Sequence, residues 1–326
     1  MSSWPDVASV LSGDRRALAK AITLIESTRA DHRTRADALL DALLPHTGQS
    51  LRLGISGVPG VGKSTFIEAL GLFLIEQGHR VAVLAVDPSS SVSGGSILGD
   101  KTRMERLSAN DAAFIRPSPT SGALGGVAEH TREALLLCEA AGFDIMIVET
   151  VGVGQSETAV AGMTDLFVLL QLPNAGDDLQ AIKRGVMELA DVVVIIKADL
   201  DDAAATRAQA QITSTIRVFG FHGNAGQAAA APVLKLSALK GDGLDAFWHT
   251  VQAQAQQRRD SGAFNARREK QRQAWLWDIV HARLRAGFQA HAGVREALPR
   301  VLAEVNAART APTVAARALL DLFEKT

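Results

Sequence analysis

The stretch Gly57-Val58-Pro59-Gly60-Val61-Gly62-Lys63-Ser64-Thr65 decides the fold class of this chain. It matches the pattern G-x-x-x-x-G-K-[ST], and it is preceded by Leu51-Arg-Leu-Gly-Ile-Ser, an apolar run that predicts a strand. Residues 64–77 follow with the apolar spacing of a helix. Because the motif requires a strand before it and a helix after it, a chance glycine-rich turn is a poor explanation, and we predict a phosphate-binding loop (P-loop).

Each residue type in the loop has a chemical reason. Glycines let the backbone wrap around phosphate groups, so that its N–H groups donate to the phosphate oxygens. Lys63 is placed to reach the β- and γ-phosphates, the Ser64 hydroxyl to bind Mg²⁺, and Thr65 to approach the α-phosphate. The whole segment from Gly57 to Thr65 is therefore predicted to bind a nucleoside triphosphate.

Further apolar runs continue the strand and helix pattern on the carboxyl side of the loop. They begin at Val81, Asp144, Leu166, Val192 and Val233, and helical segments separate them. Uniformly apolar strands are typical of a parallel sheet that is covered on both faces, and strand–helix alternation indicates βαβ units. We predict an α/β fold, a P-loop NTPase with a doubly wound, mostly parallel sheet and helical extensions at both ends.

The helical extensions give the predicted domain organisation. Residues 1–47 form an N-terminal helical region, 48–256 the P-loop domain, and 257–326 a C-terminal helical arm. The arm begins near the Arg- and Gln-rich stretch 258–272 and continues into an apolar cluster around Trp275 and Trp277. This cluster is consistent either with a helical appendix packed on the domain or with an oligomerisation surface.

Composition excludes several function classes. The 326 residues carry a formal net charge of −1, 5% aromatic residues and no Tyr, which argues against a nucleic-acid partner. The single cysteine, Cys138, suits a reducing compartment. The sequence has no apolar run of about 18 residues for a membrane span and no signal-peptide pattern at its start. A cytoplasmic protein without membrane association is expected.

The stretch Ile196-Lys197-Ala-Asp199 stands at the end of a predicted strand, where guanine-specific sites usually carry Asn-Lys-x-Asp. Asp199 can accept hydrogen bonds from guanine N1–H and the 2-amino group, and the Lys197 stem can cover the base. Ile196 replaces the Asn that would contact guanine N7 and brace the P-loop. A later loop, Ser237-Ala238-Leu239, is placed to offer a backbone N–H to guanine O6. Asp199 and this loop together favour GTP over ATP.

Acidic and basic groups supply the remaining predicted chemistry. Glu149 ends a strand, where an acid usually holds Mg²⁺, and Gly152 can donate its N–H to the γ-phosphate. The Ser/Gly-rich segment between Asp87 and Asp100 is interpreted as a switch that closes when either aspartate meets Mg²⁺ or the attacking water, with a solvated loop as the alternative. Lys183 follows another strand end and could offset transition-state charge, although it too could lie on a solvated loop.

The segments VDPSSSVSGGSILGDKTRM, FDIMIVETVGVGQSE and GDDLQAIKRGVMELAD resemble the MeaB/ArgK family of GTPases, and the resemblance covers nearly the whole chain. It implies a GTP-hydrolysing chaperone of an adenosylcobalamin-dependent acyl-CoA mutase that gates cofactor loading and protection. It also implies a homodimer joined through C-terminal helices. The metal and catalytic group would be Ser64, Asp87, Asp100 and Glu149, and Lys183 would lie in a switch that senses the mutase.

Two other functions stay open at this stage. A metal-insertion GTPase of the hydrogenase or urease type would need a His- or Cys-rich tract, which one cysteine and scattered histidines do not provide. A small-molecule kinase on a P-loop scaffold would need a specific phosphoryl acceptor and would not respond to a mutase.

Overall fold

The computed structural model describes residues 4–86, 104–117, 124–150, 156–173, 184–219 and 230–324. Its strands are β1 (Leu51–Gly57), β2 (Val81–Val86), β3 (Ala113–Arg116), β4 (Ile145–Thr150), β5 (Leu166–Gln171), β6 (Val192–Ile195) and β7 (Val233–Lys235). In the described residues they form one seven-stranded sheet in the order β3-β2-β4-β1-β5-β6-β7, and every pairing is parallel. The predicted fold class is confirmed.

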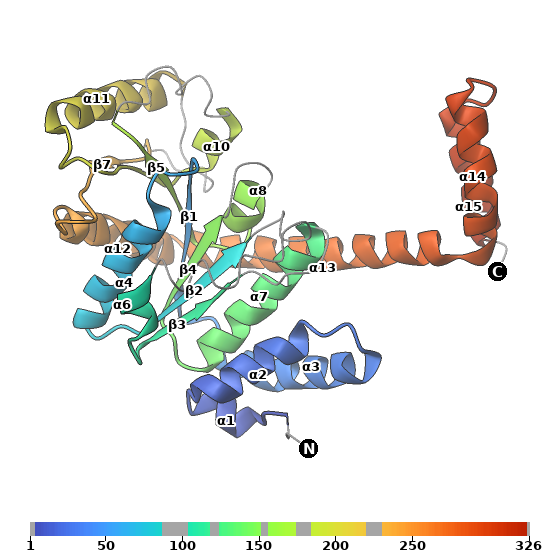
Figure 1. Cartoon of the computed structure of the whole chain (residues 1–326), viewed down its shortest axis with the longest axis horizontal. Coiled ribbons are helices and arrows are strands. Elements are labelled where there is room, and N and C mark those ends of the chain that lie inside the picture. The colour runs from blue at the N-terminus through green and yellow to red at the C-terminus, as the bar shows by residue number, and fades with distance from the viewer. Residues whose placement is uncertain are drawn as a thin grey trace. The chain divides into compact units, whose positions relative to one another are not determined.

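Helices cover both faces of this sheet (Figure 1). The helices in the first part of the whole chain are α1 (Val7–Leu11), α2 (Arg15–Ile25), α3 (Ala30–Leu43), the short 3₁₀ helix η1 (Leu44–His46), α4 (Lys63–Glu76), α6 (Glu105–Ser108) and α7 (Leu124–Ala140). They are followed by α8 (Ser156–Ala161), α10 (Arg184–Leu189), α11 (Asp202–Phe219), α12 (Leu244–Asp260), α13 (Ala263–Ala290), α14 (Ala292–Asn306) and α15 (Pro312–Glu324).

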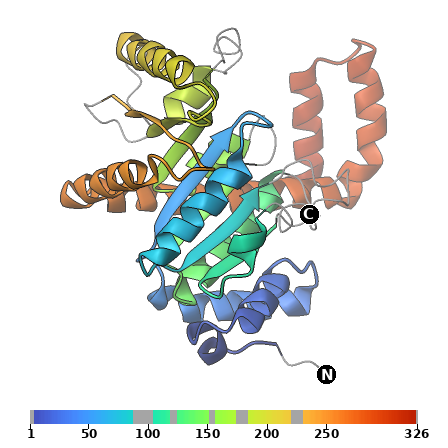
Figure 2. The same cartoon turned by 60° about the vertical axis from the view of Figure 1, so that its left-hand side comes forward.

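Alternating side chains of the strands pack in separate core clusters on the two faces of the sheet. In β2, Val81 and Val83 pack in the cluster that contains Phe66 of α4, whereas Ala82 and Leu84 pack in the cluster that contains α7. Successive strand residues point to opposite faces, so an entirely apolar strand is buried on both. Helices α1, α2 and α3 extend the α7 layer, as Figure 2 shows.

The strand β3 was not predicted from the sequence. It contains only four residues and ends in Arg116, so it lacks the long apolar run of β2, β4 and β5. It pairs with β2 from Val81↔Ala113 to Leu84↔Arg116 at the edge of the sheet. An edge strand has one neighbour and needs less apolar sequence than a central one.

Two compact units divide the chain, residues 1–271 and 272–326. In the first unit, Arg258 of α12 and Arg268 of α13 are buried and paired with Asp191 (2.6 Å) and Asp165 (2.7 Å), respectively. These pairs attach both helices to the sheet. In the second unit, α14 and α15 pack through a small apolar cluster, and the rings of Phe288 and Phe323 lie 5.5 Å apart.

None of the helices that the structure describes is both long and apolar enough to cross a membrane.

Candidate functional site

The P-loop joins the carboxyl end of β1 to the first turn of α4. At two of its positions, the backbone conformation or the lack of space favours glycine over any other residue. Gly57 has φ +157°, and a Cβ added there would lie 2.7 Å from the carbonyl oxygen of Leu170. Gly62 is the N-cap of α4 with φ +110°, a left-handed conformation that disfavours side chains. The chain therefore turns sharply from β1 into α4 because both positions are glycine.

The N-terminus of α4 presents its free backbone N–H groups beside the loop. The helix starts at Lys63, and its first turn contains no acidic residue that would compete with an anion. Ser64 is half-buried and Thr65 is exposed. Free N–H groups and the positive end of the helix dipole form a binding site for phosphate.

The ammonium group of Lys63 donates to the carbonyl oxygens of Gly57 (2.7 Å) and Val58 (3.4 Å). Burial lowers the pKa of Lys63, and the negative charges of Glu149 and Glu157 oppose this shift. Glu149 and Glu157 are both buried. The structure thus places Lys63, Glu149 and Glu157 close enough to interact electrostatically.

The buried Glu157 is a residue that sequence reasoning did not select as a site residue. It belongs to the short helix α8, which follows the segment 151–155 outside the described residues. The signal that could have identified it is an acidic residue directly after the Val-Gly-Val-Gly-Gln-Ser stretch that follows Glu149. Its burial beside a lysine shows that it is not an ordinary surface carboxylate.

The oxygen donors at this edge fit a magnesium ion. Glu149 lies near the carboxyl end of β4, opposite Ile55 of β1, and Ser64 lies in the first turn of α4, so a carboxylate and a hydroxyl are available. Among the described residues, no three His, Cys, Asp or Glu side chains are grouped to hold a metal. Magnesium in nucleotide sites needs only one or two carboxylates in addition to phosphate oxygens and water.

Four predicted site residues, Asp87, Asp100, Gly152 and Lys183, lie outside the described residues. Their roles stay predictions.

The ends of β6 and β7 bring together the residues predicted to read the base. Asp199 accepts a hydrogen bond from the Ser237 hydroxyl, which lowers the pKa of Asp199 and keeps it ionised. Ser237 is buried, its N–H donates to the carbonyl oxygen of Asp242 (2.9 Å), and its hydroxyl accepts the N–H of Lys240 (3.3 Å). Ala238 is half-buried and Leu239 is exposed. The loop after β7 therefore holds the Asp199 carboxylate in place.

The strand order places these groups on one edge of the sheet. β1 lies between β4 and β5, so the P-loop, Glu149 and the end of β6 all follow the carboxyl ends of neighbouring or near-neighbouring strands. In open parallel sheets, ligands bind at this edge where the strand order reverses. The observed arrangement has the geometry of a nucleotide site.

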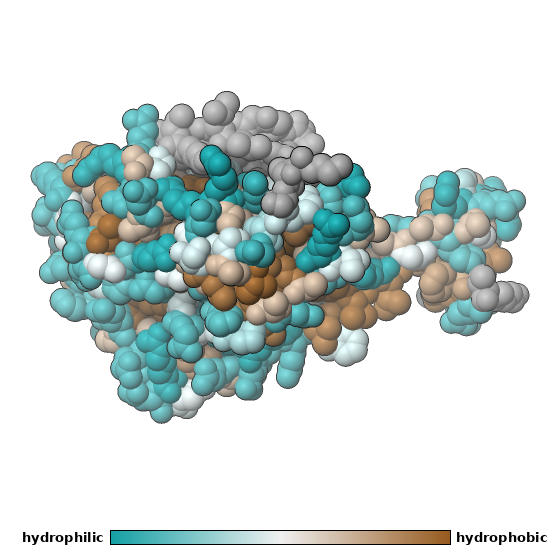
Figure 3. Space-filling model, turned by 90° about the horizontal axis from the view of Figure 1, so that it is seen from below, coloured by the Kyte–Doolittle hydropathy of each residue, from teal (hydrophilic) through white to brown (hydrophobic). Residues whose placement is uncertain are grey.

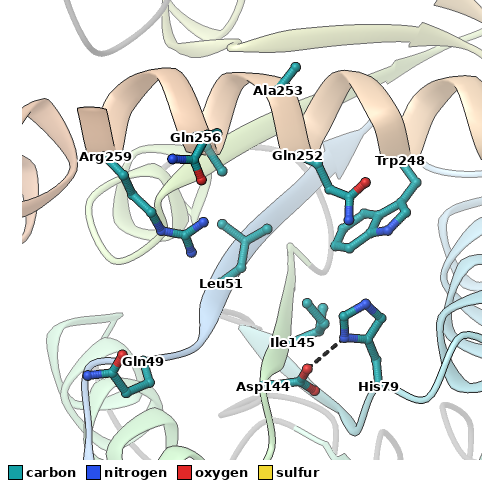
Figure 4. A pocket seen from close by; sticks show the side chains of 11 residues that line it. Gln49, Leu51, His79, Asp144, Ile145, Trp248, Gln252, Ala253, Gln256 and Arg259 are labelled. Atoms are coloured by element: carbon teal, nitrogen blue, oxygen red, sulfur yellow. Dashed lines mark hydrogen bonds and ion pairs between the residues drawn. The ribbon is translucent and has the colours of Figure 1, made fainter. Parts of the chain in front are cut away.

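A separate pocket of about 470 Å³ lies at the opposite edge, between α12 and the amino ends of β1 and β4 (Figure 4). Its lining includes Gln49, Trp248 and Arg259, and His79 Nδ1 lies 2.6 Å from an Asp144 carboxylate oxygen. Because parallel strands direct their carboxyl ends to the other edge, this pocket is not part of the nucleotide site.

Fold and site together define a P-loop nucleotide-hydrolase class of protein. The family model described as methylmalonyl Co-A mutase-associated GTPase MeaB matches residues 18–292. This chain belongs to that family, and it is a GTP-hydrolysing enzyme.

Relatives and a solved structure agree with this assignment. A putative GTPase of Caulobacter vibrioides is 52% identical over 96% of this chain and 95% of its own length. The mitochondrial methylmalonic aciduria type A homolog of Mus musculus is 46% identical over 97% of this chain and 78% of its own length. A crystal structure of an LAO/AO transport system kinase superposes with a TM-score of 0.79 at 36% identity, covering 98% of this chain and 96% of that one.

Proposed function

We propose that this protein is a GTPase chaperone of an adenosylcobalamin-dependent acyl-CoA mutase, methylmalonyl-CoA mutase or a relative. GTP hydrolysis would gate the loading of the cofactor and the protection or reactivation of the mutase. The observation that carries the proposal is a complete P-loop geometry within a chain whose residues 18–292 match the mutase-associated family. The mouse relative, named for methylmalonic aciduria, supports the same partner.

Within this proposal, the loop N–H groups and Lys63 hold the phosphates. Ser64 and Glu149, with Asp87 and Asp100, would hold Mg²⁺, which neutralises charge on the phosphate oxygens when bound. Lys63 stabilises the charge that develops on the transferred phosphoryl group, because its ammonium is held within the loop by backbone acceptors. Gly152 would donate its N–H to the γ-phosphate and connect hydrolysis to the following segment.

The base would be read at the end of β6. Asp199, held by Ser237, accepts from guanine N1–H and the 2-amino group, and the Lys197 stem covers a face of the ring. The loop Ser237 to Leu239 would direct a backbone N–H to guanine O6. Adenine has no donor at N1, so it would face the Asp199 carboxylate unfavourably.

The C-terminal unit would join two copies of the chain into a homodimer in the cytoplasm. It exposes large apolar side chains on α13, including Leu276 (59% exposed), Trp277 (58%) and Leu284 (59%). In the part of Figure 3 occupied by α14 and α15, hydrophobic and hydrophilic residues are interspersed. Exposed aromatic and aliphatic side chains are typical of interface cores.

Steady-state hydrolysis of GTP and of ATP, with and without purified methylmalonyl-CoA mutase from the same source, tests the proposal. GTP-selective turnover that increases with the mutase is the expected result. A GTP turnover rate that changes neither with this mutase nor with an isobutyryl-type mutase would contradict the chaperone role. Phosphoryl transfer to a small acceptor, with no response to a mutase, would establish a kinase instead.

The Lys183→Ala variant tests the partner-sensing switch. We expect GTP affinity within about twofold of wild type, because the P-loop contacts remain, and loss of mutase-stimulated turnover. Stimulation that persists in this variant would remove Lys183 from the mechanism.

A further inference from the structure

Ile196 is a direct neighbour of the P-loop. It follows β6, its side chain is 1% exposed, and it belongs to the same core cluster as Val61 and Phe66. A Cβ built on Gly62 would lie 3.2 Å from Ile196 Cδ1. The terminal methyl group of Ile196 therefore packs against Gly62, the N-cap of α4.

Lys197 contacts the same loop through its ammonium group. Its backbone is left-handed, with φ +58°, and its Nζ donates to the carbonyl oxygen of Gly60 at 3.2 Å. Its Cε would lie 3.6 Å from a Cβ on Gly62. The P-loop is thus held from the β6 end by one apolar contact and one charged hydrogen bond.

These contacts leave few donors for a base. Guanine presents N7 and O6 as acceptors, and N1–H and the 2-amino group as donors. In residues 195–200, only Lys197 and Asp199 carry polar side chains. One donor of the ammonium is bound to the Gly60 carbonyl oxygen, the carboxylate can only accept, and the N–H groups of Ile196 and Ala198 donate to backbone carbonyls.

We propose that Ile196 makes this nucleotide site insensitive to guanine N7, so that the base is recognised through its N1, C2 and O6 positions alone. The inference rests on the proposed role of Asp199 as the base-reading residue. The side chain at 196 contributes to the site by packing on Gly62, a function that needs no polar group. The ligands it admits therefore include guanine nucleotides altered at position 7.

Calorimetric titration of GDP and 7-deaza-GDP in the presence of Mg²⁺ tests this directly on the wild-type protein. We expect the two dissociation constants to agree within about twofold, because no hydrogen bond to N7 is lost. The Ile196→Asn variant adds a carboxamide donor, so GDP should bind more tightly than 7-deaza-GDP by about fivefold to tenfold. Ile196→Val is the matched apolar control and should keep the ratio near that of wild type.

A wild-type preference for GDP over 7-deaza-GDP of about fivefold or more would overturn the proposal, because one ordinary hydrogen bond has that value. A folded Ile196→Asn variant that binds GDP and 7-deaza-GDP with equal affinity would also contradict the proposal. Titration of IDP, which lacks the 2-amino group, separates failure of the proposal about N7 from failure of the assignment of Asp199 to the base. If IDP binds as tightly as GDP, Asp199 does not accept from the 2-amino group, and the inference about Ile196 falls with that assignment.

Discussion

Lys63 Nζ donates a hydrogen bond of 2.7 Å to the carbonyl oxygen of Gly57, the glycine that opens the same phosphate-binding loop. A lysine that would otherwise extend into solvent is thereby folded over the loop, and burial lowers its pKa. In the proposed mechanism, these backbone acceptors hold the ammonium where charge would develop during phosphoryl transfer.

Replacing Lys63 by Met should therefore remove transition-state stabilisation while keeping the side-chain volume. We expect kcat for GTP hydrolysis to fall by about 10³-fold, the effect of losing one preorganised donor. Lys270→Met, at an exposed position on α13, is the control and should keep wild-type turnover. Turnover in Lys63→Met within about tenfold of wild type would exclude the assigned role.

Two glycines of the loop should differ in their tolerance of alanine. At Gly57 a Cβ meets the Leu170 carbonyl oxygen at 2.7 Å, whereas at Gly60 (φ +75°) nothing lies within 4 Å. We expect Gly57→Ala to lower the free energy of unfolding by about 3 kcal/mol, and Gly60→Ala by only about 1 kcal/mol from backbone strain. Urea denaturation of the two variants checks the difference, and equal losses would show that the close contact is relieved elsewhere.

Asp199→Asn should change the base that the site prefers. An amide can donate to the C2 carbonyl of xanthine but cannot accept both guanine donors, so GTP affinity should fall by about tenfold or more and XTP affinity should rise. Asp201→Asn is a matched control two positions away. Asp201 accepts the N–H of Ala204 at 2.8 Å, a cap that Asn can also form, so its nucleotide affinities should not change. Unchanged GTP binding by Asp199→Asn would place the base elsewhere.

Glu139 connects the start of β1 to α7 and α13. It accepts from the Gly48 N–H (2.8 Å), from Arg52 Nε (2.9 Å) and from the Ser50 hydroxyl, and it lies near Arg268. Burial opposes its ionisation, but these partners outweigh burial, so the pKa of Glu139 lies below its ordinary value of 4.5. Glu139→Gln should cost about 3 kcal/mol at neutral pH, the order expected for breaking a buried pair.

The pH dependence of this variant has a definite sign. A carboxylate whose folded-state pKa is lowered stabilises the protein above its unfolded-state pKa, and this contribution disappears as the pH falls through the folded-state value. The thermal unfolding temperature of wild type should therefore fall as the Glu139 contribution is lost below about pH 4.5. The unfolding temperature of Glu139→Gln should depend less steeply on pH in this acid range. The exposed Glu269→Gln serves as control, and parallel curves for wild type and Glu139→Gln would refute the prediction.

By itself, the sequence determined the class of protein and most of the sheet. The P-loop motif, the apolar strand runs and Asp199 are local signals, because a loop conformation or a strand periodicity depends on neighbouring residues. The edge strand β3 was not predicted, and its four residues lack the long apolar runs of β2, β4 and β5.

Only the tertiary structure decided which distant residues support the site. Lys197 and Gly60 are 137 positions apart, and neither local sequence predicts that the Lys197 ammonium donates to the Gly60 carbonyl oxygen. The Arg-rich stretch 258–272 has the composition of a solvated helix, yet Arg258 and Arg268 are buried. Their charges are tolerated because Asp191 and Asp165, supplied by remote segments, neutralise them, and burial of a charge depends on partners that no local window contains.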